Sequence, residues 1–456
     1  MDIIDPSHDP SGQWLDRCLK TGKPVVARWA HHRYYLDGAP PVELIAVCVP
    51  GTGPSPRHQF VVSDRCEDVE AWLRGRVPDG GNLAELGERV GAPVLALNGP
   101  WRLAPVAIAK PWGREIWHTG IEQRGQSRVT DGRHGIPLPW ALALAPPQLL
   151  ADGMREPALL KILDPLAEEV FGDLYFELHE EKREVYVVTH VDRGAWPDGR
   201  GAIRFGFDQT LRRGYPSDEA FRQAFREAVA RYETVRRAID GICDLRRMEA
   251  GIAANTPVDA ATLKGWLATV PSRLLAEEHE ARTAMNRFTQ MLPLQVGDVV
   301  KVPCLTPHAL QHGVRTVEFQ TPVYERKILS FAQKVLTQDH WDTAQACQLM
   351  SLDAGHLEAL LLLEEGADHR LEQVVVFSDF EVRRLRLRPG ARWDLHPGDH
   401  YCILMVVAGT PRLGQLSCQP EDALLLPRTA GPLAIEAPAA GDPPVILICL
   451  PRQPGS

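Results

Sequence analysis

A pair of short motifs that lie far apart in the sequence constrains the fold of this chain more than any other feature. The first motif contains Glu177, His179 and Glu184, and the second covers residues 297–308 and ends at His308. Two imidazoles and two carboxylates form a donor set that suits a divalent transition-metal ion. We therefore predict that the two motifs meet around one ion, which can polarise an oxygen atom or lower the pKa of bound water.

The pattern around the first motif predicts two strands joined by a turn. Glu177 and His179 are two residues apart, so their side chains point to the same face of a strand. Glu184 lies an odd number of residues further on, and a continuous strand would direct it to the opposite face. Lys182 and Arg183 stand between, and a turn there would return Glu184 to the site on a second strand.

Each of these residues also has an interpretation without a metal. The two histidines could be buried structural side chains. Glu177 could instead form a salt bridge with Lys182 or Arg183, and Lys182 could lie in a solvated turn. The joint placement of both motifs on strand-like sequence favours the metal site.

Length and composition restrict the class of protein. A chain of 456 residues is too long for one compact core, so two or three domains are expected. A net charge of −9 argues against nucleic acid or a basic membrane-binding face, and no apolar run is long enough to span a membrane. An anionic substrate would need a local cluster of Lys or Arg.

Cysteine usage and the start of the chain predict a cytoplasmic protein. The nine cysteines include no C-x-x-C pair, and several stand in apolar runs, as Cys48 and Cys449 do. This distribution is typical of reduced core residues, Cys18 included, and not of a disulfide framework. The first residues show neither a basic region nor an apolar signal segment.

Shifts in pattern along the chain predict its organisation. Ser217 is a good N-cap, and apolar residues that include Phe221 and Phe225 then recur at helical spacing. Short strands with Pro and Gly turns surround this helical stretch. We predict four parts: an N-terminal α/β segment of unknown role at 1–105, a metal-binding β domain at 106–215 plus 291–345, a helical insertion at 216–290, and a second β domain at 346–456.

The two motifs resemble the two metal-binding motifs of the cupin superfamily. Two positions differ from the usual pattern, because Glu177 stands where the first histidine is usual and Leu305 where glycine is preferred. The resemblance implies a mainly β fold with two cupin-type jelly-roll domains and an α insertion in the first. It also implies one divalent ion held by Glu177, His179, Glu184 and His308.

Within that superfamily the chain is similar to type I phosphomannose isomerases over about residues 106–450. Those proteins carry a segment like the Lys-Pro-Trp-Gly that begins at Lys110, a Lys-x-Glu triplet that here begins at Lys182, and a helical insertion. An acidic residue and an arginine follow the second motif, here Glu318 and Arg326. The resemblance implies that Arg326, Glu318 and Lys182 are catalytic and that Lys110 and Arg326 contact the substrate.

Departures from the family pattern qualify these assignments. Glu177 replaces a glutamine, so the ligand set with a divalent ion is formally neutral, which weakens the ion as a Lewis acid and tightens its binding. The separation of Glu318 and Arg326 is two residues shorter than the family pattern, and a simple ion pair is the alternative for both. Lys110 could instead belong to a packing turn. Pro432 stands where the second β domain would need a ligand, so that domain is predicted to be metal-free.

The resemblance implies interconversion of mannose 6-phosphate and fructose 6-phosphate through an enediol. The implied cofactor is one divalent ion, zinc first, with manganese, iron and cobalt as alternatives. Two other functions stay open: an Fe- or Mn-dependent cupin oxygenase and a non-catalytic phosphosugar-binding cupin. The expected partner is a small phosphosugar, without nucleic acid or membrane, and the chain is expected to be a monomer or homodimer.

Overall fold

The computed structural model describes residues 3–6, 15, 20–51 and 57–452. Its tertiary contacts divide the chain into two compact units. The terminal unit comprises Met1–Val106, Trp117–Lys161 and Leu360–Ser456. The central unit comprises Ala107–Ile116 and Ile162–Ala359. The four-part division of the sequence stays a prediction.

The first part of the terminal unit is a small α/β layer. Its sheet has the order β1 (Ile3–Ile4), β2 (Val25–His31), β3 (Val42–Val49), β4 (Gln59–Ser63) and β5 (Leu95–Ala96). Two helices follow β4, α2 (Cys66–Leu73) and α3 (Leu83–Val90). The apolar run of β3 is almost wholly buried, which explains why this segment forms the centre of the layer.

Strands from residues 101–137 and from the C-terminal region share one large sheet in the terminal unit. Its order is β12 (Gly135–Pro137), β11 (Arg128–Thr130), β6 (Trp101–Ala104), β29 (Ala423–Leu426), β26 (Cys402–Ala408), β31 (Val445–Pro451), β24 (Phe380–Leu387), β23 (His369–Val376) and β22 (Leu361–Glu365). A second sheet contains β25 (Arg392–Leu395), β30 (Leu433–Glu436), β27 (Arg412–Leu413) and β28 (Leu416–Ser417). Buried side chains of both sheets form one hydrophobic core.

Shorter elements complete this unit. They are the ribbon of β9 (Ile121–Glu122) and β10 (Gly125–Gln126), and the helices α4 (Leu138–Leu142) and α5 (Pro146–Leu149). Each helix has proline within its first two positions. The N–H that proline lacks would have no helical partner there, so its absence costs nothing.

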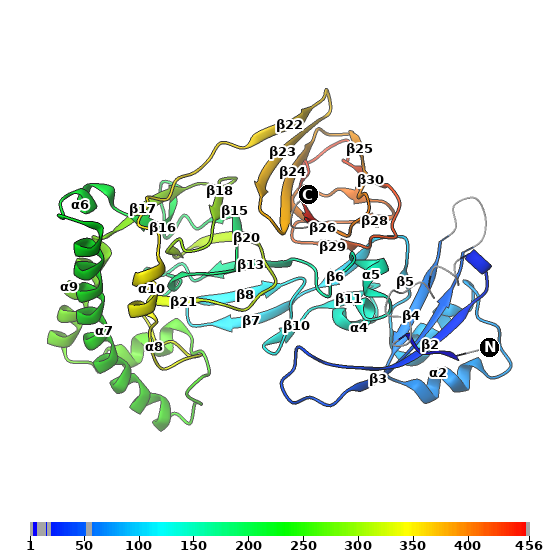
Figure 1. The fold of residues 1–456 in the computed structure, drawn as a ribbon, viewed down its shortest axis with the longest axis horizontal. Coiled ribbons are helices and arrows are strands. Elements are labelled where there is room, and N and C mark those ends of the chain that lie inside the picture. The colour runs from blue at the N-terminus through cyan, green and yellow to red at the C-terminus, as the bar shows by residue number, and fades with distance from the viewer. Residues whose placement is uncertain (1–2, 7–14, 16–19, 52–56, 453–456) are drawn as a thin grey trace. The chain divides into compact units, whose positions relative to one another are not determined.

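Two sheets form the β part of the central unit (Figure 1). One has the order β18 (Val299–Val302), β15 (Glu184–Val191), β20 (Val314–Gln320), β13 (Leu159–Pro165), β8 (Gly113–Trp117) and β7 (Val106–Lys110). The other has the order β17 (Thr289–Leu294), β16 (Gly201–Phe207), β19 (His308–Leu310), β14 (Phe176–Leu178) and β21 (Lys327–Ser330). Side chains of both sheets contribute to a single core.

A helical segment is inserted between two neighbouring strands of the second sheet. It comprises α6 (Gln209–Arg213), α7 (Asp218–Glu249), α8 (Ala260–Leu267) and α9 (Ser272–Asn286), and α10 (Thr343–Leu349) lies later in the chain. β16 and β17 are antiparallel partners, and Phe207 at the end of β16 pairs with Thr289 at the start of β17. The chain therefore leaves and re-enters the sheet at the same end, and the helices lie beside this sheet (Figure 1).

Aromatic side chains attach α7 to the sheet. Phe221 and Phe225, one helical turn apart, are fully buried against Phe207 of β16. Phe225 also contacts Phe176 of β14 and Phe288. The ring pairs are mostly edge-to-face, an arrangement that adds favourable electrostatics to the burial of apolar area.

The predicted cap of α7 is confirmed, and its removal should have a measurable cost. Ser217 has extended backbone, and its Oγ accepts a hydrogen bond from the Ala220 N–H at 3.1 Å. We expect Ser217→Ala to lower the free energy of unfolding by about 1 kcal/mol, measured by urea denaturation. The matched control is Ser272→Ala in the exposed first turn of α9, whose N-cap position is Pro271. Equal effects of the two variants would contradict the cap's contribution.

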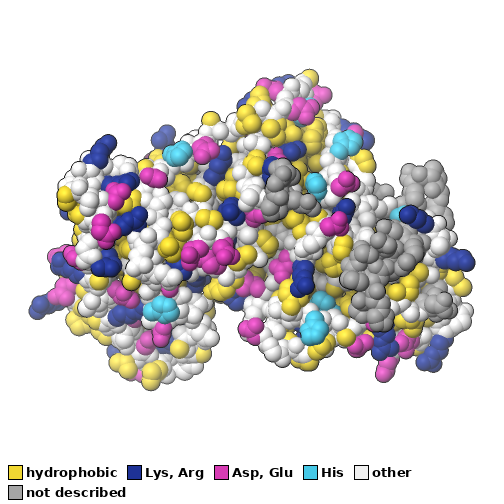
Figure 2. Space-filling view, in the orientation of Figure 1, with side chains coloured by type: hydrophobic (Ala, Val, Ile, Leu, Met, Phe, Trp, Pro, Cys, Tyr) yellow, Lys and Arg dark blue, Asp and Glu magenta, His cyan; other side chains and the backbone are white. Residues whose placement is uncertain are grey.

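The structure confirms a mainly β fold with a helical segment, whereas closed jelly rolls in the two β regions stay a prediction. The cysteines within the described residues are free thiols, and all of them except Cys304 are buried; Cys18 lies outside the described residues. Within the described ranges, none of the helices is both long and apolar enough to cross a membrane. Acidic and basic side chains are interspersed over the face shown in Figure 2.

Candidate metal centre

Strand pairing in the central unit brings the two motifs together. Glu177 on β14 lies directly opposite His308, the first residue of β19. β14 ends at Leu178, the chain bends at Glu180 and Glu181, and β15 begins at Glu184. Two strands separated by a change of direction are confirmed, but β14 and β15 belong to different sheets, and the bend lies at Glu180 and Glu181 instead of the predicted Lys182 and Arg183.

A second link between the motifs explains the unusual residue at position 305. The Leu305 N–H donates to the His179 carbonyl at 2.6 Å, which ties the loop before His308 to the end of β14. Leu305 has φ 64°, a left-handed conformation that favours glycine because it has no Cβ. Leucine therefore occupies a backbone conformation in which glycine would be unstrained.

Three of the four predicted ligands have donor atoms close enough to share an ion. One ligand atom each from Glu177, His179 and His308 lies within 4.8 Å of the other two. Glu184 adjoins this group, because its Oε1 lies 3.4 Å from His179 Nε2 and its Oε2 lies 3.2 Å from His308 Nε2. Both histidines and Glu184 are buried, while the Glu177 side chain remains 18 % exposed, so solvent can reach the site on that side.

The hydrogen bonds of the two imidazoles fit a bound cation. His179 Nδ1 lies 3.0 Å from the Glu325 carbonyl and His308 Nδ1 lies 2.9 Å from the Thr306 carbonyl, so each Nδ1 carries the proton. In the neutral rings the Nε2 lone pairs then face carboxylate oxygens of Glu184, acceptor against acceptor. A metal ion between them satisfies both, and carbonyl-held imidazoles are typical of metal ligands.

Arg326 is held against the most accessible ligand. Its Nη1 lies 3.7 Å from Glu177 Oε2, its Nη2 donates to Thr337 Oγ1 at 2.6 Å, and its guanidinium lies 4.5 Å from the centre of the Tyr175 ring. Burial alone would raise the pKa of Glu177, but the Arg326 charge brings it below the ordinary value. Arg326 therefore compensates the extra negative charge that Glu177 introduces.

Lys182 and Tyr186 hold the other carboxylate. Lys182 Nζ lies 2.6 Å from Glu184 Oε1, and the Tyr186 hydroxyl donates to Glu184 Oε2 at 2.5 Å. Burial would raise the pKa of Glu184, but the Lys182 ammonium holds it well below its usual range. Burial raises the pKa of Tyr186 well above its usual value, as do the nearby charges of Glu184 and Glu318. Lys182 is thus a buried contact of the site and not a solvated turn residue.

The two remaining predicted residues lie close to this cluster. Glu318 is buried on β20 directly opposite Tyr186. Lys110 at the end of β7 pairs with Glu115 of β8, 3.3 Å away, and both are largely buried. Burial lowers the pKa of Arg326, but the negative charges of Glu177 and, more weakly, Glu115 help to raise it above its ordinary value. All the sequence-predicted site residues thus belong to one neighbourhood, and their catalytic and ligand roles stay predictions.

Several site residues were missed by the sequence reasoning. Tyr186 stands two residues after Glu184 on the same strand, so alternation alone could have placed it on the same face. Tyr175 precedes β14 and offered a similar signal, two residues before Glu177. Glu325 could not be found in this way, because it contributes through its backbone carbonyl, which accepts a hydrogen bond from His179 Nδ1.

Comparison with known proteins places the fold but not the family. No protein-family model and no curated protein matches the chain. Among solved structures, the mannose 6-phosphate isomerase from Bacillus subtilis is 14 % identical, with a TM-score of 0.52 over 77 % of this chain and 99 % of that one. A variant of phosphomannose isomerase from Salmonella typhimurium and a zinc-bound mannose 6-phosphate isomerase are each 13 % identical, with TM-scores of 0.55 over 78 % of this chain and 100 % of theirs. The chain shares the fold of these enzymes.

Proposed function

We propose that this chain is a divalent-metal-dependent aldose–ketose isomerase that acts on a phosphorylated sugar, with mannose 6-phosphate and fructose 6-phosphate as the first candidate pair. The convergence of Glu177, His179 and His308 supports this proposal, because their ligand atoms meet in a fold shared with mannose 6-phosphate isomerases. Zinc is the first candidate ion, since one of those neighbours is zinc-bound and the ligands are imidazole and carboxylate.

The proposed metal ligands are Glu177, His179, His308 and Glu184. A divalent ion there would polarise the sugar oxygens beside the reacting carbons. The Glu184 carboxylate is already oriented for binding the ion, because Lys182 contacts one of its oxygens and Tyr186 the other. The Lys182 ammonium also lowers the pKa of the carboxyl and so keeps it ionised, which a metal ligand requires.

The isomerisation moves a proton between two neighbouring carbons, so a group must take it from one carbon and deliver it to the other. Glu318 and Lys182 are the proposed proton-handling residues. Glu318 lies outside the ligand set, and Lys182 stands at the edge of it with its ammonium on Glu184. A proton taken from the first carbon returns to the second, and the sugar's hydroxyl proton moves to the former carbonyl oxygen, so the step needs no redox partner.

Arg326 is proposed to stabilise negative charge on the substrate. Its planar guanidinium can form two parallel hydrogen bonds to an enediolate or a phosphate. The Tyr175 ring and Thr337 hold it in position before any substrate arrives. Lys110, near the same cluster, is proposed as a second substrate contact.

A coupled assay tests the proposal. Purified protein, stripped with chelator and reloaded with zinc, manganese, cobalt or iron, is given mannose 6-phosphate and related phosphosugars, and ketose formation is followed. Turnover that depends on the added ion is expected. Saturable phosphosugar binding by calorimetry without turnover under any metal would instead establish the non-catalytic alternative, and oxygen uptake without isomerisation the oxygenase.

Replacing the charged ligand tests the role of Glu177. We expect Glu177→Gln to weaken zinc binding about tenfold, because it removes a carboxylate from the ligand set. It should also raise kcat at saturating metal, because the ion regains net positive charge and Arg326 loses its ion pair. Competition with a chromophoric chelator measures affinity, and the coupled assay measures kcat.

Glu180→Gln is the matched control for this substitution, since Glu180 lies three residues after Glu177 in the bend that follows β14. Its side chain is exposed and pairs with Lys327. It should change neither quantity. Unchanged zinc affinity in Glu177→Gln would remove Glu177 from the ligand set.

A further inference from the structure

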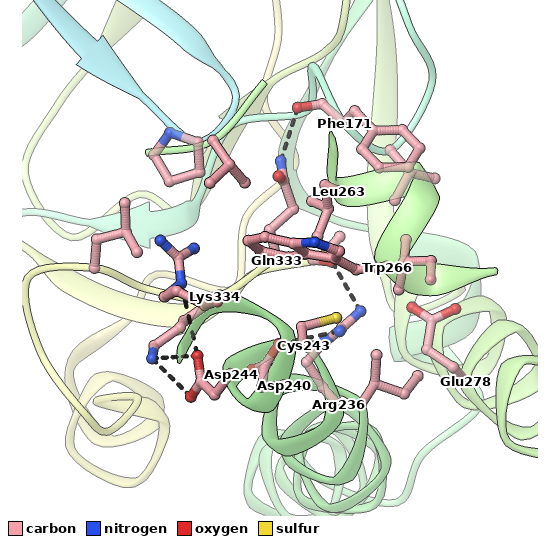
Figure 3. Close-up of a pocket in the computed structure, with 18 of the residues that line it drawn as sticks. Phe171, Arg236, Asp240, Cys243, Asp244, Leu263, Trp266, Glu278, Gln333 and Lys334 are labelled. Carbon is pink, nitrogen blue, oxygen red and sulfur yellow. Dashed lines mark hydrogen bonds and ion pairs between the residues drawn. The ribbon is translucent and has the colours of Figure 1, made fainter. Parts of the chain in front are cut away.

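A cavity lies among the inserted helices of the central unit. Its volume is about 230 Å³, and α7, α8 and α9 enclose it together with residues 169–171 and 332–336 (Figure 3). The described residues that line it include none of those assigned to the metal centre. A ligand held here is therefore separate from the substrate of the proposed isomerase.

Apolar side chains form much of the cavity wall. The indole of Trp266 crosses the middle of the view in Figure 3, with Leu263 beside it, and Ile239, Leu267 and Leu275 also line the space. An apolar protein cavity of about 150 Å³ is enough to hold benzene. The larger volume here accommodates one ring with a short substituent.

The acidic groups of the wall that are buried or half-buried already have cationic partners. Asp240 accepts from Arg236 at 3.0 Å, and both oxygens of Asp244 lie 2.7 Å from Lys334 Nζ. Figure 3 shows the Lys334–Asp244 pair on one side of the cavity and Glu278 on the other. Glu278 pairs with Arg282 at 3.1 Å and also accepts from the Tyr232 hydroxyl.

Arg247 has the longest ion pair among the cations of the wall, because its Nε lies 3.8 Å from Asp244 Oδ1, which also binds Lys334. Its side chain is only 7 % exposed, and its Nη1 donates to the carbonyls of Ala253 and Thr256. Its Nε is buried with no hydrogen-bond partner among the described residues. A buried guanidinium with an unused donor favours an anion beside it.

We propose that this cavity binds a small carboxylic acid with an apolar ring, the ring against Trp266 and the carboxylate on Arg247. The indole face, 5.5 Å from the Arg247 guanidinium, places the apolar and cationic parts of the site next to each other. The acid supplies the acceptor that Arg247 Nε lacks, and its ring fills space that is otherwise lined by hydrocarbon. Neutral and cationic analogues lack the charge complement.

Calorimetry with matched ligands tests this site. The whole protein is titrated in EDTA with 3-phenylpropanoate and with its neutral amide, so that binding to the metal centre does not contribute. We expect saturable binding of the acid, about tenfold or more tighter than that of the amide, because a charge-assisted hydrogen bond to the buried guanidinium is lost in the amide. No saturable binding of the acid, or equal affinity for acid and amide, overturns the proposal.

Variants locate the binding. Leu263→Trp fills the cavity and should abolish binding, and Arg247→Met should weaken it about tenfold or more. Arg246→Met should leave it unchanged, because Arg246 is partly exposed on the same helix, does not line the cavity and pairs with Glu249. Bound acid should also slow alkylation of Cys243, which lines the cavity, relative to Cys304 in the same unmodified protein. Full affinity in Leu263→Trp, or unprotected Cys243 at saturating acid, contradicts the assigned site.

Discussion

Replacing His308 with alanine is expected to weaken zinc binding by more than about 100-fold and to reduce isomerase activity to background. His308 is the ligand contributed by the second motif, and it lies opposite Glu177 on the neighbouring strand. Its loss removes a nitrogen donor and also leaves Glu184 Oε2 without the ring that it faces at 3.2 Å. Metal content after dialysis and turnover in the coupled assay measure the two effects.

His190→Ala is the control for this variant, because His190 is exposed on β15 and belongs to the same sheet pair. It should keep one bound ion and full activity. Stoichiometric zinc in His308→Ala would refute the metal centre, whereas normal zinc without isomerase activity in the unaltered protein would refute only the proposed reaction.

Truncating Phe225 should have the largest effect on stability. Phe225 is fully buried between α7 and the sheet, where it contacts Phe176, Phe207 and Phe288. Phe225→Ala removes its apolar area from the core and leaves a cavity that the sheet cannot close, at a cost of about 3–5 kcal/mol. Urea denaturation followed by tryptophan fluorescence and by far-ultraviolet circular dichroism measures the loss for the central unit.

Leu245→Ala on the same helix is the matched control, since Leu245 is 60 % exposed and its truncation should change stability by less than about 0.5 kcal/mol. If Phe225→Ala also lowered the free energy of unfolding by less than about 0.5 kcal/mol, α7 would not depend on this contact with the sheet. Because β14 carries both Phe176 and Glu177, we also expect weakened zinc binding in Phe225→Ala but not in Leu245→Ala.

Local patterns predicted the local features of this protein well. The alternation of Glu177 and His179, followed by an odd step to Glu184, required the chain to change direction, and the structure has a bend at Glu180 and Glu181. Ser217 before an apolar stripe predicted the start of α7.

Non-local pairing was beyond the reach of these patterns. Trp101 on β6 pairs with Leu425 on β29, and this joins a strand from the start of the chain to the C-terminal sheet. No spacing rule connects positions so far apart, since strand partners are selected by the packing of whole faces. The same limit applied to Arg326, whose pairing with Glu177 depends on the loop that precedes β21.

The sequence by itself determined which residues could bind a metal, how the strand carrying them turns, and where the helical segment begins. These features depend on side-chain alternation and capping, which act over a few residues. The tertiary structure decided that Arg326 neutralises Glu177, that Tyr186 and Lys182 hold Glu184, and that the inserted helices enclose a cavity with Arg247 in its wall. Those arrangements arise only when distant segments pack together, because a charged side chain that is buried loses its hydration and needs an opposite charge nearby.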